Sequence, residues 1–468
     1  MYAGIRTLHF VGIGGIGMSG IAEVLLNLGY RITGSDLSEN ANVLRLRSLG
    51  ARIQKGHSAE QVEGADAIVI SSAVTPDNPE VMAARAHRIP VVRRAEMLAE
   101  LMRLKRGVAI AGTHGKTTTT SLTAALLDEA GMDPTVVNGG IVKALGSNAR
   151  HGEGEFLVTE ADESDGSFLK LTPTIAVVTN MDPEHMEHYG DFNAVRDAFL
   201  QFVSKIPFYG LAVLCQDHPE TAALARKLAD KRVITYGLDE AADVRAVDIR
   251  QEGVRTHFTV RRQDPQCGAV ETFGPITLTL PGRHNVANTL AAIACARELA
   301  VPWPVIARTL SRFKGVQRRF DLLHEAADLV VIDDYGHHPV EIAATLEAVR
   351  AGYPNRRLTA VFQPHRFSRV RDHLEEFQSC FKQADLVLVD AIYRAGETPP
   401  EGPIGERGQE LLMEGIAERS GAPTLPLPAD HAWGRDLDGA LQAGDVLVFL
   451  GAGDISARAR QFAAGLTV

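Results

Sequence analysis

Cysteine, aromatic residues and long hydrophobic runs are all scarce in this sequence of 468 residues. The four cysteines, Cys215, Cys267, Cys295 and Cys380, lie far apart and form no CxxC pair, which excludes a zinc ribbon and a disulfide-rich secreted domain. We interpret them as small buried residues in a reducing compartment. The apolar run at residues 8–13 is too short for a signal peptide or a membrane span. We therefore expect a cytoplasmic protein that makes no membrane contact.

An excess of positive charge is also lacking. Lysine and arginine total 48 against 58 aspartate and glutamate residues, and the net charge of -10 opposes non-specific binding to nucleic acid. With 45% apolar and 23% charged residues the composition is that of a globular protein, and 43 glycines favour α/β turns over disorder. At about 100 to 200 residues per domain, the length predicts two to four domains. We expect small-molecule substrates, no nucleic acid, and a monomer or dimer.

Alternating strand and helix patterns predict an α/β protein of three domains. We expect a Rossmann-like domain at residues 1–96, a central domain similar to a phosphate-loop ATPase at residues 97–314, and a second Rossmann-like domain at residues 315–468. The predicted strands are Leu8–Ile13, Tyr30–Gly34, Ala67–Ser71, Val108–Ala111, Phe156–Thr159, Ile175–Thr179, Leu329–Ile332, Leu358–Phe362, Leu386–Val389 and Val446–Leu450.

Three helices, an insert and a loop complete this prediction. Helix-period segments run from Met18 to Leu28, from the loop around Lys116 to Gly131, and from Asn285 to Leu299. Residues 233–280 alternate apolar and polar side chains with a period of two, which predicts an antiparallel insert in the central domain. The proline-rich residues 398–406 predict a surface loop.

The first glycine-rich loop is Gly12–Gly17 (GIGGIG), which lies between a predicted strand and a predicted helix. Asp36 follows nineteen residues beyond its last glycine. Such glycines allow a tight turn and bring N–H donors and the positive end of a helix close to a diphosphate. The same pattern also occurs as a merely structural turn. NAD and a nucleotide-sugar diphosphate therefore both remain open as ligands.

The second glycine-rich loop is Gly112–Thr117 (GTHGKT), a shortened phosphate loop in which Ile110 stands where the GxxxxGK[ST] pattern has glycine. The residues that bind phosphate and metal in such a loop are nevertheless present. Gly115 permits close approach of the backbone, Lys116 offers a charge to the β- and γ-phosphates, and the Thr117 hydroxyl can ligate Mg²⁺. We predict phosphate binding here, with a structural turn as the alternative.

Acidic side chains and a histidine follow two predicted strands of the same domain. Glu160, Asp162, Glu163 and Asp165 follow the first strand, and His185 lies after the second in the segment DPEHMEH. Mg²⁺ prefers hard oxygen ligands, so some of these carboxylates are candidate ligands, while a solvated acidic surface is the alternative. The spacing around His185 indicates no metal site by itself.

Two clusters rich in histidine and arginine follow strands of the third domain. They are residues 333–339 (DDYGHHP) and residues 365–369 (HRFSR). Side chains beyond strand ends on one sheet edge can converge on a ligand, and Arg366 and Arg369 are suited to forked contacts with carboxylates or phosphates. Taken singly, each of these residues is about equally well explained as part of a binding site or as an ordinary surface residue.

Together, these segments resemble the Mur ligase family. The resemblance covers residues 9 to about 370 and runs through HFVGIGGIGMSGIA, GTHGKTTTT, EADESDGSF, NMDPEHMEHYG, PGRHNVANTLAA, RRFD, DDYGHHPVEI and FQPHRFSR. The shortened phosphate loop is the form that this family uses. The resemblance implies ATP-dependent amide synthesis for peptidoglycan, in which L-alanine is joined to the lactyl carboxylate of UDP-N-acetylmuramic acid. An acyl phosphate and a tetrahedral intermediate would form, and ADP and phosphate would leave.

The resemblance also implies roles for single positions, with ATP and Mg²⁺ as cofactors and Mn²⁺ as an alternative metal. The implied UDP-sugar site comprises Gly14, Gly15, Ile16, Gly17, Asp36 and Ser71. The implied ATP site comprises Gly112, Thr113, His114, Gly115, Lys116, Thr117, Thr118, Asn285, Asn288, Arg319 and Asp334. The implied metal ligands are Thr117, Glu160 and His185, and the implied amino-acid site comprises Tyr335, His337, His365, Arg366 and Arg369. The implied catalytic residues are Lys116, Glu160, His185, Arg319 and His337.

One departure from the family and three alternatives remain. Several relatives that add later residues of the stem peptide carry a carbamylated lysine where Phe199, Leu200 and Gln201 stand here, so that scheme is not carried over. A recycling ligase that attaches a whole tripeptide is the alternative within the family. An NAD-dependent dehydrogenase would explain residues 12–17 but not the phosphate loop. A non-catalytic nucleotide-binding regulator would leave the histidine and arginine clusters without a role.

Overall fold

The structure is a computed structural model, and it describes residues 4–263, 268–427, 437 and 439–466. Its internal contacts divide the chain into two units. The first unit comprises Met1–Val247, Phe258–Ile276 and Ala287–Lys314, and the second comprises Asp248–His257, Thr277–Val286 and Gly315–Val468. Within the described ranges, no helix is long and apolar enough to cross a membrane.

The predicted buried state of the cysteines is confirmed in part. Cys215 and Cys295 are buried free thiols, and Cys380 is a half-buried free thiol. Cys267 lies outside the described residues.

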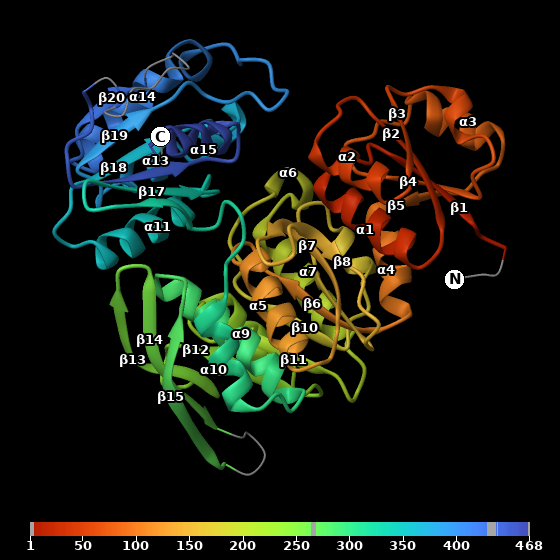
Figure 1. Cartoon of the computed structure of the whole chain (residues 1–468), viewed down its shortest axis with the longest axis horizontal. Helices are drawn as coiled ribbons and strands as arrows, with labels where there is room; N and C mark the ends of the chain where they lie inside the picture. The colour runs from red at the N-terminus through yellow and green to blue at the C-terminus, as the bar shows by residue number, and fades with distance from the viewer. Residues whose placement is uncertain (1–3, 264–267, 428–436, 438, 467–468) are drawn as a thin grey trace. The chain divides into compact units, whose positions relative to one another are not determined.

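The first unit begins with a five-stranded sheet in the order β3-β2-β1-β4-β5, in which every neighbouring pair is parallel (Figure 1). This order, with helices between the strands, confirms the Rossmann-like prediction. The strands are β1 Thr7–Val11, β2 Arg31–Asp36, β3 Arg52–Lys55, β4 Ala67–Ile70 and β5 Val91–Arg93. The helices are α1 Ile16–Asn27, α2 Ala41–Ser48, the 3-10 turn η1 Ala59–Val62, α3 Pro79–Ala86 and α4 Arg94–Arg103.

Helix α1 shows how the sequence covers this sheet. Ile21, Val24 and Leu25 recur at helical spacing and are buried, and burying each such side chain contributes about 1.5–3 kcal/mol. Gly29, which follows the helix at φ +87°, adopts a left-handed conformation that glycine accepts at little cost. The same pattern predicted a helix over Met18–Leu28, and the structure confirms it.

A ten-stranded sheet has the order β15-β14-β13-β12-β11-β10-β6-β9-β7-β8. Its strands are β6 Arg106–Ala111, β7 Thr135–Val142, β8 Ser147–Arg150, β9 Phe156–Glu160, β10 Ile175–Val178, β11 Leu211–Cys215, β12 Val233–Gly237, β13 Val244–Glu252, β14 Arg255–Gln263 and β15 Val270–Leu278. Its helices are α5 Lys116–Glu129, the 3-10 turn η2 Ser167–Lys170, α6 Met186–Tyr189, α7 Phe192–Ser204, α8 Pro219–Arg226, α9 Arg283–Glu298 and α10 Trp303–Arg312. Helix α5 ends at Glu129 and its C-cap Ala130 is followed by Gly131 at φ +77°, the position after the cap that the sequence predicted for this glycine.

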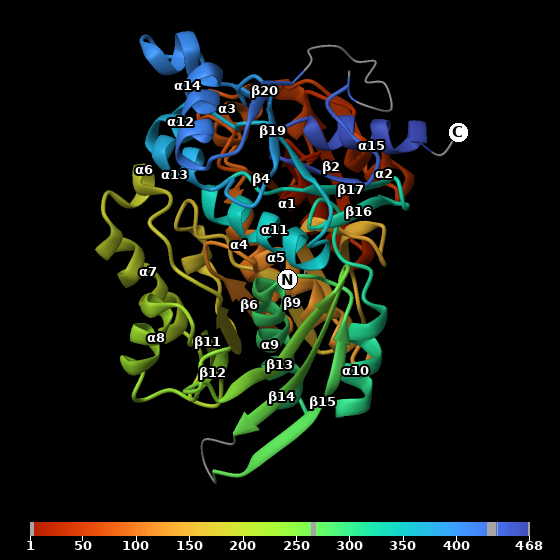
Figure 2. The same cartoon turned by 90° about the vertical axis from the view of Figure 1, so that its left-hand side faces the viewer.

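The predicted antiparallel insert over residues 233–280 needs one correction. Strand β12 pairs in parallel with both β11 and β13, so residues 233–237 continue the parallel sheet. The antiparallel part begins with β13 and β14, which lie side by side in Figure 2 and are linked only by Gly253 and Val254. A two-residue link joins only antiparallel neighbours. The period of two misled at β12 because a half-covered strand alternates in either kind of sheet.

The second unit holds a six-stranded sheet in the order β16-β17-β21-β18-β19-β20, in which only β16 is antiparallel to its neighbour. The predicted bounds of β18 and β19 are confirmed to the residue. The strands are β16 Asp321–Glu325, β17 Leu329–Asp334, β18 Leu358–Phe362, β19 Leu386–Val389, β20 Thr424–Pro426 and β21 Asp445–Leu450. The helices are α11 Pro339–Gly352, α12 Phe367–Asp372, α13 Leu374–Ser379, α14 Pro403–Arg419 and α15 Ile455–Leu466.

The surface loop predicted at residues 398–406 is wrong in its second half. Helix α14 begins at Pro403, inside the proline-rich run. Proline has no N–H and its fixed φ suits the first helical position, where no intrahelical donor is needed. The proline that predicted a loop therefore opens a helix.

Candidate active site

The first glycine loop is held in place by polar groups of β2. Gly14 N donates a hydrogen bond to Asp36 Oδ2 at 2.8 Å, and Gly12 N donates one to Ser35 O at 2.9 Å. A Cβ on Gly14 would stand 2.8 Å from the Asp36 carboxylate, so only glycine fits there. Asp36 thus acts on the loop itself, while Ser71 lies in the turn after the neighbouring β4. The loop opens toward the start of α1, which is suited to a diphosphate.

The phosphate loop joins β6 to α5 through two glycines at positive φ. Gly112 has φ +127° and Gly115 has φ +83°, and Gly115 is the N-cap of α5. A Cβ on Gly115 would lie 2.4 Å from Asn288 Oδ1, so the amide of Asn288 rests directly against the loop. The structure therefore brings Asn288 to the predicted ATP site. Asn285 belongs to the second unit, where its Nδ2 donates to Pro281 O at 2.8 Å.

Lys116 is anchored over its own loop. Its Nζ donates to Gly112 O at 2.6 Å and Thr113 O at 3.1 Å, and it lies 2.9 and 2.8 Å from the two carboxylate oxygens of Glu163. Burial alone would lower the pKa of Lys116, but the charges of Glu163 and Asp162 outweigh it and raise that pKa above its usual value. The side chain is therefore a fixed ammonium group at the mouth of the loop.

The end of β10 holds the other side of the loop. His114 N donates to Asn180 Oδ1 at 2.7 Å, and the Thr179 hydroxyl donates to His114 O at 2.5 Å. Asp182 N donates to Thr113 Oγ1 at 2.9 Å. The carboxylates of Asp182 and Glu184 lie 3.5 and 3.4 Å from His114 Nε2. Thr113 and His114 are thus held by residues that follow β10, while Thr118 is buried in the first turn of α5.

The three implied metal ligands have different surroundings. Glu160 ends β9, and its Oε1 accepts a hydrogen bond from Gly139 N at 2.8 Å. Thr117 is buried in the first turn of α5. His185 has φ +60° and lies 3.9 Å from Glu184 and 3.8 Å from a carboxylate oxygen of Glu187. The carboxylate and the hydroxyl are hard oxygen donors of the kind that Mg²⁺ and Mn²⁺ prefer, and the imidazole adds a nitrogen donor, so two of the three residues fit such an ion by donor type.

In the second unit, the carboxylate of Asp334, the last residue of β17, is hydrogen-bonded to three neighbouring segments. It accepts hydrogen bonds from Phe320 N at 2.7 Å, Gly336 N at 2.8 Å and the Thr345 hydroxyl at 3.2 Å. Burial raises its pKa to about 6. Asp334 therefore fixes the segment that carries Arg319 and the segment that carries the two histidines.

The predicted aromatic, histidine and arginine side chains of the second unit come together. The ring centroids of Tyr335 and His337 are 5.0 Å apart, and those of His337 and His365 are 6.1 Å apart. The Arg319 guanidinium lies 5.0 Å from the Tyr335 ring centroid, and Arg369 Nη1 lies 3.3 Å from His365 Nδ1. These side chains converge because they follow the carboxyl ends of β17 and β18, and both of these strands pair in parallel with β21.

Burial is the main cause that lowers the pKa of His365 to about 4, and the charges of His337, Arg369 and Arg366 lower it further. His365 also stacks on Tyr393 at 5.5 Å between ring centroids. Arg366 has φ +70°, and its N–H donates to Tyr393 O at 2.8 Å. His365 is therefore a neutral, oriented side chain at neutral pH.

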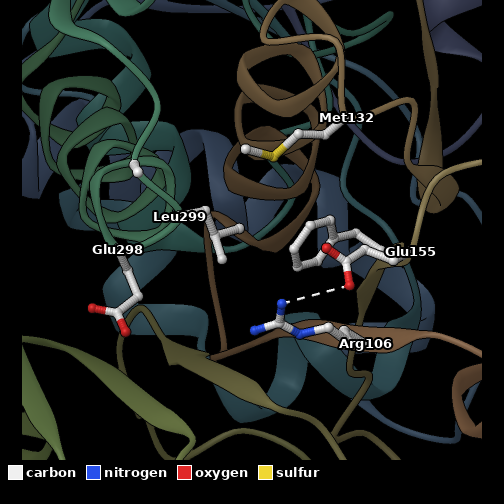
Figure 3. Close-up of a pocket in the computed structure, with 7 residues that line it drawn as sticks. Arg106, Met132, Glu155, Glu298 and Leu299 are labelled. Atoms are coloured by element: carbon white, nitrogen blue, oxygen red, sulfur yellow. Dashed lines mark ion pairs between the residues drawn. The ribbon is translucent and has the colours of Figure 1, made fainter.

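A pocket of about 400 Å³ in the first unit lies away from these residues. Arg106 and Phe156, which line it, are paired at the amino ends of β6 and β9, whereas the phosphate loop follows the carboxyl end of β6 and Glu160 is the last residue of β9. Figure 3 shows Arg106 directed at Glu155, with 3.6 Å between their charged groups. Ligands of open α/β sheets bind at the carboxyl ends, so this pocket is not the candidate site.

Sequence reasoning missed several residues that shape the site. Asn180, which binds the phosphate loop, stood in a quoted segment without a role, and Glu341 and Tyr393 were not considered. Glu341 Oε2 lies 3.1 Å from His337 Nδ1. The two residues are four positions apart, a spacing that brings side chains together at a helix, and that spacing was the signal in the sequence. The partner of Tyr393 is distant in sequence and offered no signal.

The fold and the site define a class of protein: an α/β protein with several domains of the nucleotide-binding type and a glycine-rich loop at the start of both α1 and α5. Comparisons with known proteins agree. Family models described as Mur ligase family, catalytic domain, as Mur ligase middle domain, and as Mur ligase, glutamate ligase domain match residues 7–106, 110–296 and 318–453.

Similar whole proteins carry a consistent description. The UDP-N-acetylmuramate–L-alanine ligase of Magnetococcus marinus is 70% identical over 466 residues, covering 99% of this chain and 98% of the relative. That of a Bradyrhizobium species is 55% identical over 97% of this chain and 96% of the relative. The crystal structure of the UDP-N-acetylmuramate–alanine ligase of Thermotoga maritima matches with a TM-score of 0.81 and 28% identity, over 98% of this chain and 99% of that one. The chain belongs to the Mur ligase family.

Proposed function

We propose that this protein joins L-alanine to the lactyl carboxylate of UDP-N-acetylmuramic acid, with conversion of ATP to ADP and phosphate through an acyl phosphate, as a step of peptidoglycan precursor synthesis. The observation that carries the proposal is the half-buried Lys116 ammonium at the mouth of a loop that follows β6 and precedes α5. A phosphate loop of this form serves phosphoryl transfer, and the first glycine loop suits the diphosphate of a nucleotide sugar.

The first unit supplies the groups for activation of the carboxylate. A carboxylate and a γ-phosphate repel each other, so cationic charge must neutralise both before the carboxylate oxygen can attack phosphorus. Lys116 would provide that charge, and the backbone N–H groups at the start of α5 would bind the β-phosphate. Asn288, which lies against the loop, would contact the adenine side of the nucleotide.

Thr117, Glu160 and His185 are the residues that would hold Mg²⁺, or Mn²⁺ in its place. Such an ion polarises phosphoryl oxygens and lowers the repulsion between substrate and nucleotide. Gly139 N already orients the Glu160 carboxylate, so that this ligand needs little rearrangement.

The second unit supplies the groups for the amine. Arg319 would contact the γ-phosphate and Asp334 the ribose, while Tyr335, His337, His365, Arg366 and Arg369 would surround the amino acid. The cationic side chains suit its carboxylate, and a site built for a methyl group would discriminate L-alanine from glycine only about 10- to 200-fold.

We also propose domain limits of 1–96, 97–314 and 315–468, of which the last limit coincides with the start of the main segment of the second unit. The partners would be small molecules only, and the protein would act in the cytoplasm as a monomer or dimer.

The test is phosphate release from ATP and Mg²⁺ with UDP-N-acetylmuramic acid and one of three additions: L-alanine, the L-Ala-γ-D-Glu-diaminopimelate tripeptide, or no acceptor. Release with L-alanine alone is the expected result. Release with the tripeptide alone would assign the chain to cell-wall recycling instead. No release under any condition would contradict a ligase, and binding of ADP would then be measured.

A further inference from the structure

An amino acid that attacks an acyl phosphate must first lose a proton, because its nitrogen is an ammonium group at neutral pH. The second unit gathers titratable side chains around the ends of β17 and β18. Those that face His337 are Glu341 from α11, Tyr335 from its own loop and His365 from the loop after β18. Arg319 lies near Tyr335 and Glu341, and Arg369 lies behind His365.

The contacts of His337 fix its tautomer. Its Nδ1 lies 3.1 Å from Glu341 Oε2 and 3.2 Å from Tyr335 O. A carboxylate and a carbonyl oxygen both only accept hydrogen bonds, so Nδ1 must carry the proton. In the neutral ring, the other nitrogen, Nε2, then has a free lone pair and is the basic atom.

The other titratable groups of this cluster are less suited to take a proton. His365 Nδ1 accepts from Arg369, and burial together with neighbouring cations lowers the pKa of His365 to about 4, which makes it a weak base. The Asp334 carboxylate is already hydrogen-bonded by two backbone N–H groups and a hydroxyl. Asp333 is buried and accepts a hydrogen bond from Ser456.

Glu341 acts on His337 at two points. Its Oε2 also accepts a hydrogen bond from His337 N at 3.2 Å, so the carboxylate binds both the backbone and the ring of the same residue. Glu341 sits at the third position of α11, and the helix start therefore holds it in place. A carboxylate behind an imidazole fixes the ring and stabilises its protonated form.

We propose that His337 Nε2 accepts a proton from the ammonium group of the incoming amino acid, and that Glu341 is the positioning residue that fixes His337 for this task. This inference rests on the proposed function. The freed nitrogen lone pair attacks the acyl carbon, the bond from that carbon to the phosphate oxygen breaks, and the departing phosphate takes the second nitrogen proton. One amide, one phosphate and one protonated His337 result.

The test compares two nucleophiles in the full-length protein. Hydroxylamine is unprotonated at neutral pH, so it can trap the acyl phosphate without a base. In His337→Asn, the side-chain amide can still donate to Glu341, but Nε2 is gone. We expect kcat with L-alanine to fall roughly 100- to 10,000-fold. The KM for L-alanine and the rate of ATP-dependent hydroxamate formation should change by less than about threefold.

Glu341→Gln should show the same pattern with a smaller loss, roughly 10- to 100-fold in kcat with L-alanine. The matched control is Glu347→Gln, an exposed glutamate of the same helix, which should behave as the wild type. An equal fall of both reactions in His337→Asn, or a change confined to the KM for L-alanine, would overturn the inference. A wild type that forms neither product would instead contradict the proposed function.

Discussion

The phosphate loop of the first unit and the histidine cluster of the second unit differ in how their functional side chains are held and in the chemical task proposed for each. At the loop, the half-buried ammonium of Lys116, the first residue of α5, is held by four oxygen atoms, and charge dominates. In the cluster, the His365 ring stacks on Tyr393 and the Glu341 carboxylate orients the His337 imidazole, so the orientation of single groups is what the surroundings control. Phosphoryl transfer requires charge neutralisation, whereas amine delivery requires a correctly placed lone pair.

The largest expected effect is at the loop. Lys116→Ala should lower turnover about 1,000-fold or more, because it removes the charge that would face the transferring phosphoryl group. The change also leaves Glu163 buried without its cation, which costs about 3–5 kcal/mol of stability. Steady-state kinetics and denaturant unfolding would measure both.

The double variant Lys116→Ala/Glu163→Gln separates the two losses. It should regain most of the stability and none of the activity, since the amide needs no countercharge. Activity restored in the double variant would contradict a catalytic role for Lys116.

Alanine substitutions at two glycines test whether activity requires the backbone shape of the phosphate loop as well as the charge of Lys116. Gly115→Ala would push a Cβ to 2.4 Å from Asn288 Oδ1, and a displacement of that size should reduce activity about 100-fold. Gly131→Ala has similar backbone strain at φ +77°, but no described atom lies within 4 Å of its Cβ. The control should lose about 1–2 kcal/mol of stability and keep its activity. Equal kinetics for the two variants would show that the contact with Asn288 is irrelevant.

If Lys116 binds phosphate as proposed, Glu163, which contacts its ammonium group, would compete with that phosphate. Glu163→Gln should therefore bind ADP more tightly, by roughly tenfold or about 1.4 kcal/mol, while adenosine binding stays the same. Asp165→Asn is the matched control, because Asp165 instead accepts a hydrogen bond from Ser167 N. Calorimetric titration would measure the affinities. Weaker ADP binding in Glu163→Gln would show that the carboxylate assists the nucleotide.

The smallest expected effect concerns pH and the histidine cluster. The folded protein lowers the pKa of His365 from 6.5 to about 4, so folding favours its neutral form. This contribution to stability is complete above about pH 6.5 and is lost as the pH falls toward 4. Because the ring is partly exposed, we expect a loss of about 1–2 kcal/mol.

His365→Gln should lack that loss, so the difference in unfolding free energy between the variant and the wild type should shrink by this amount from pH 7 to pH 4.5. Denaturant unfolding at the two pH values would measure it. A constant difference would mean that His365 titrates normally in the folded protein.

The same comparison explains what sequence could and could not predict. The phosphate loop is contiguous, so GTHGKT predicted the turn, the helix and the cation without any tertiary information. The partner of Lys116 is Glu163, which lies 47 residues away, and only the pairing of β6 with β9 brings them together. The positions of residues 333–339 and 365–369 after two strands indicated that their side chains can converge, but nothing in the sequence indicated the ring stacking with Tyr393.

The most direct test of this account follows one oxygen atom. UDP-N-acetylmuramic acid labelled with ¹⁸O in its lactyl carboxylate would be converted with ATP, Mg²⁺ and L-alanine, and the released phosphate would be analysed by mass spectrometry. If the first unit activates the carboxylate by phosphoryl transfer and the second delivers the amine, each phosphate carries one ¹⁸O atom. Phosphate without label, formed together with the alanine amide, would contradict the account.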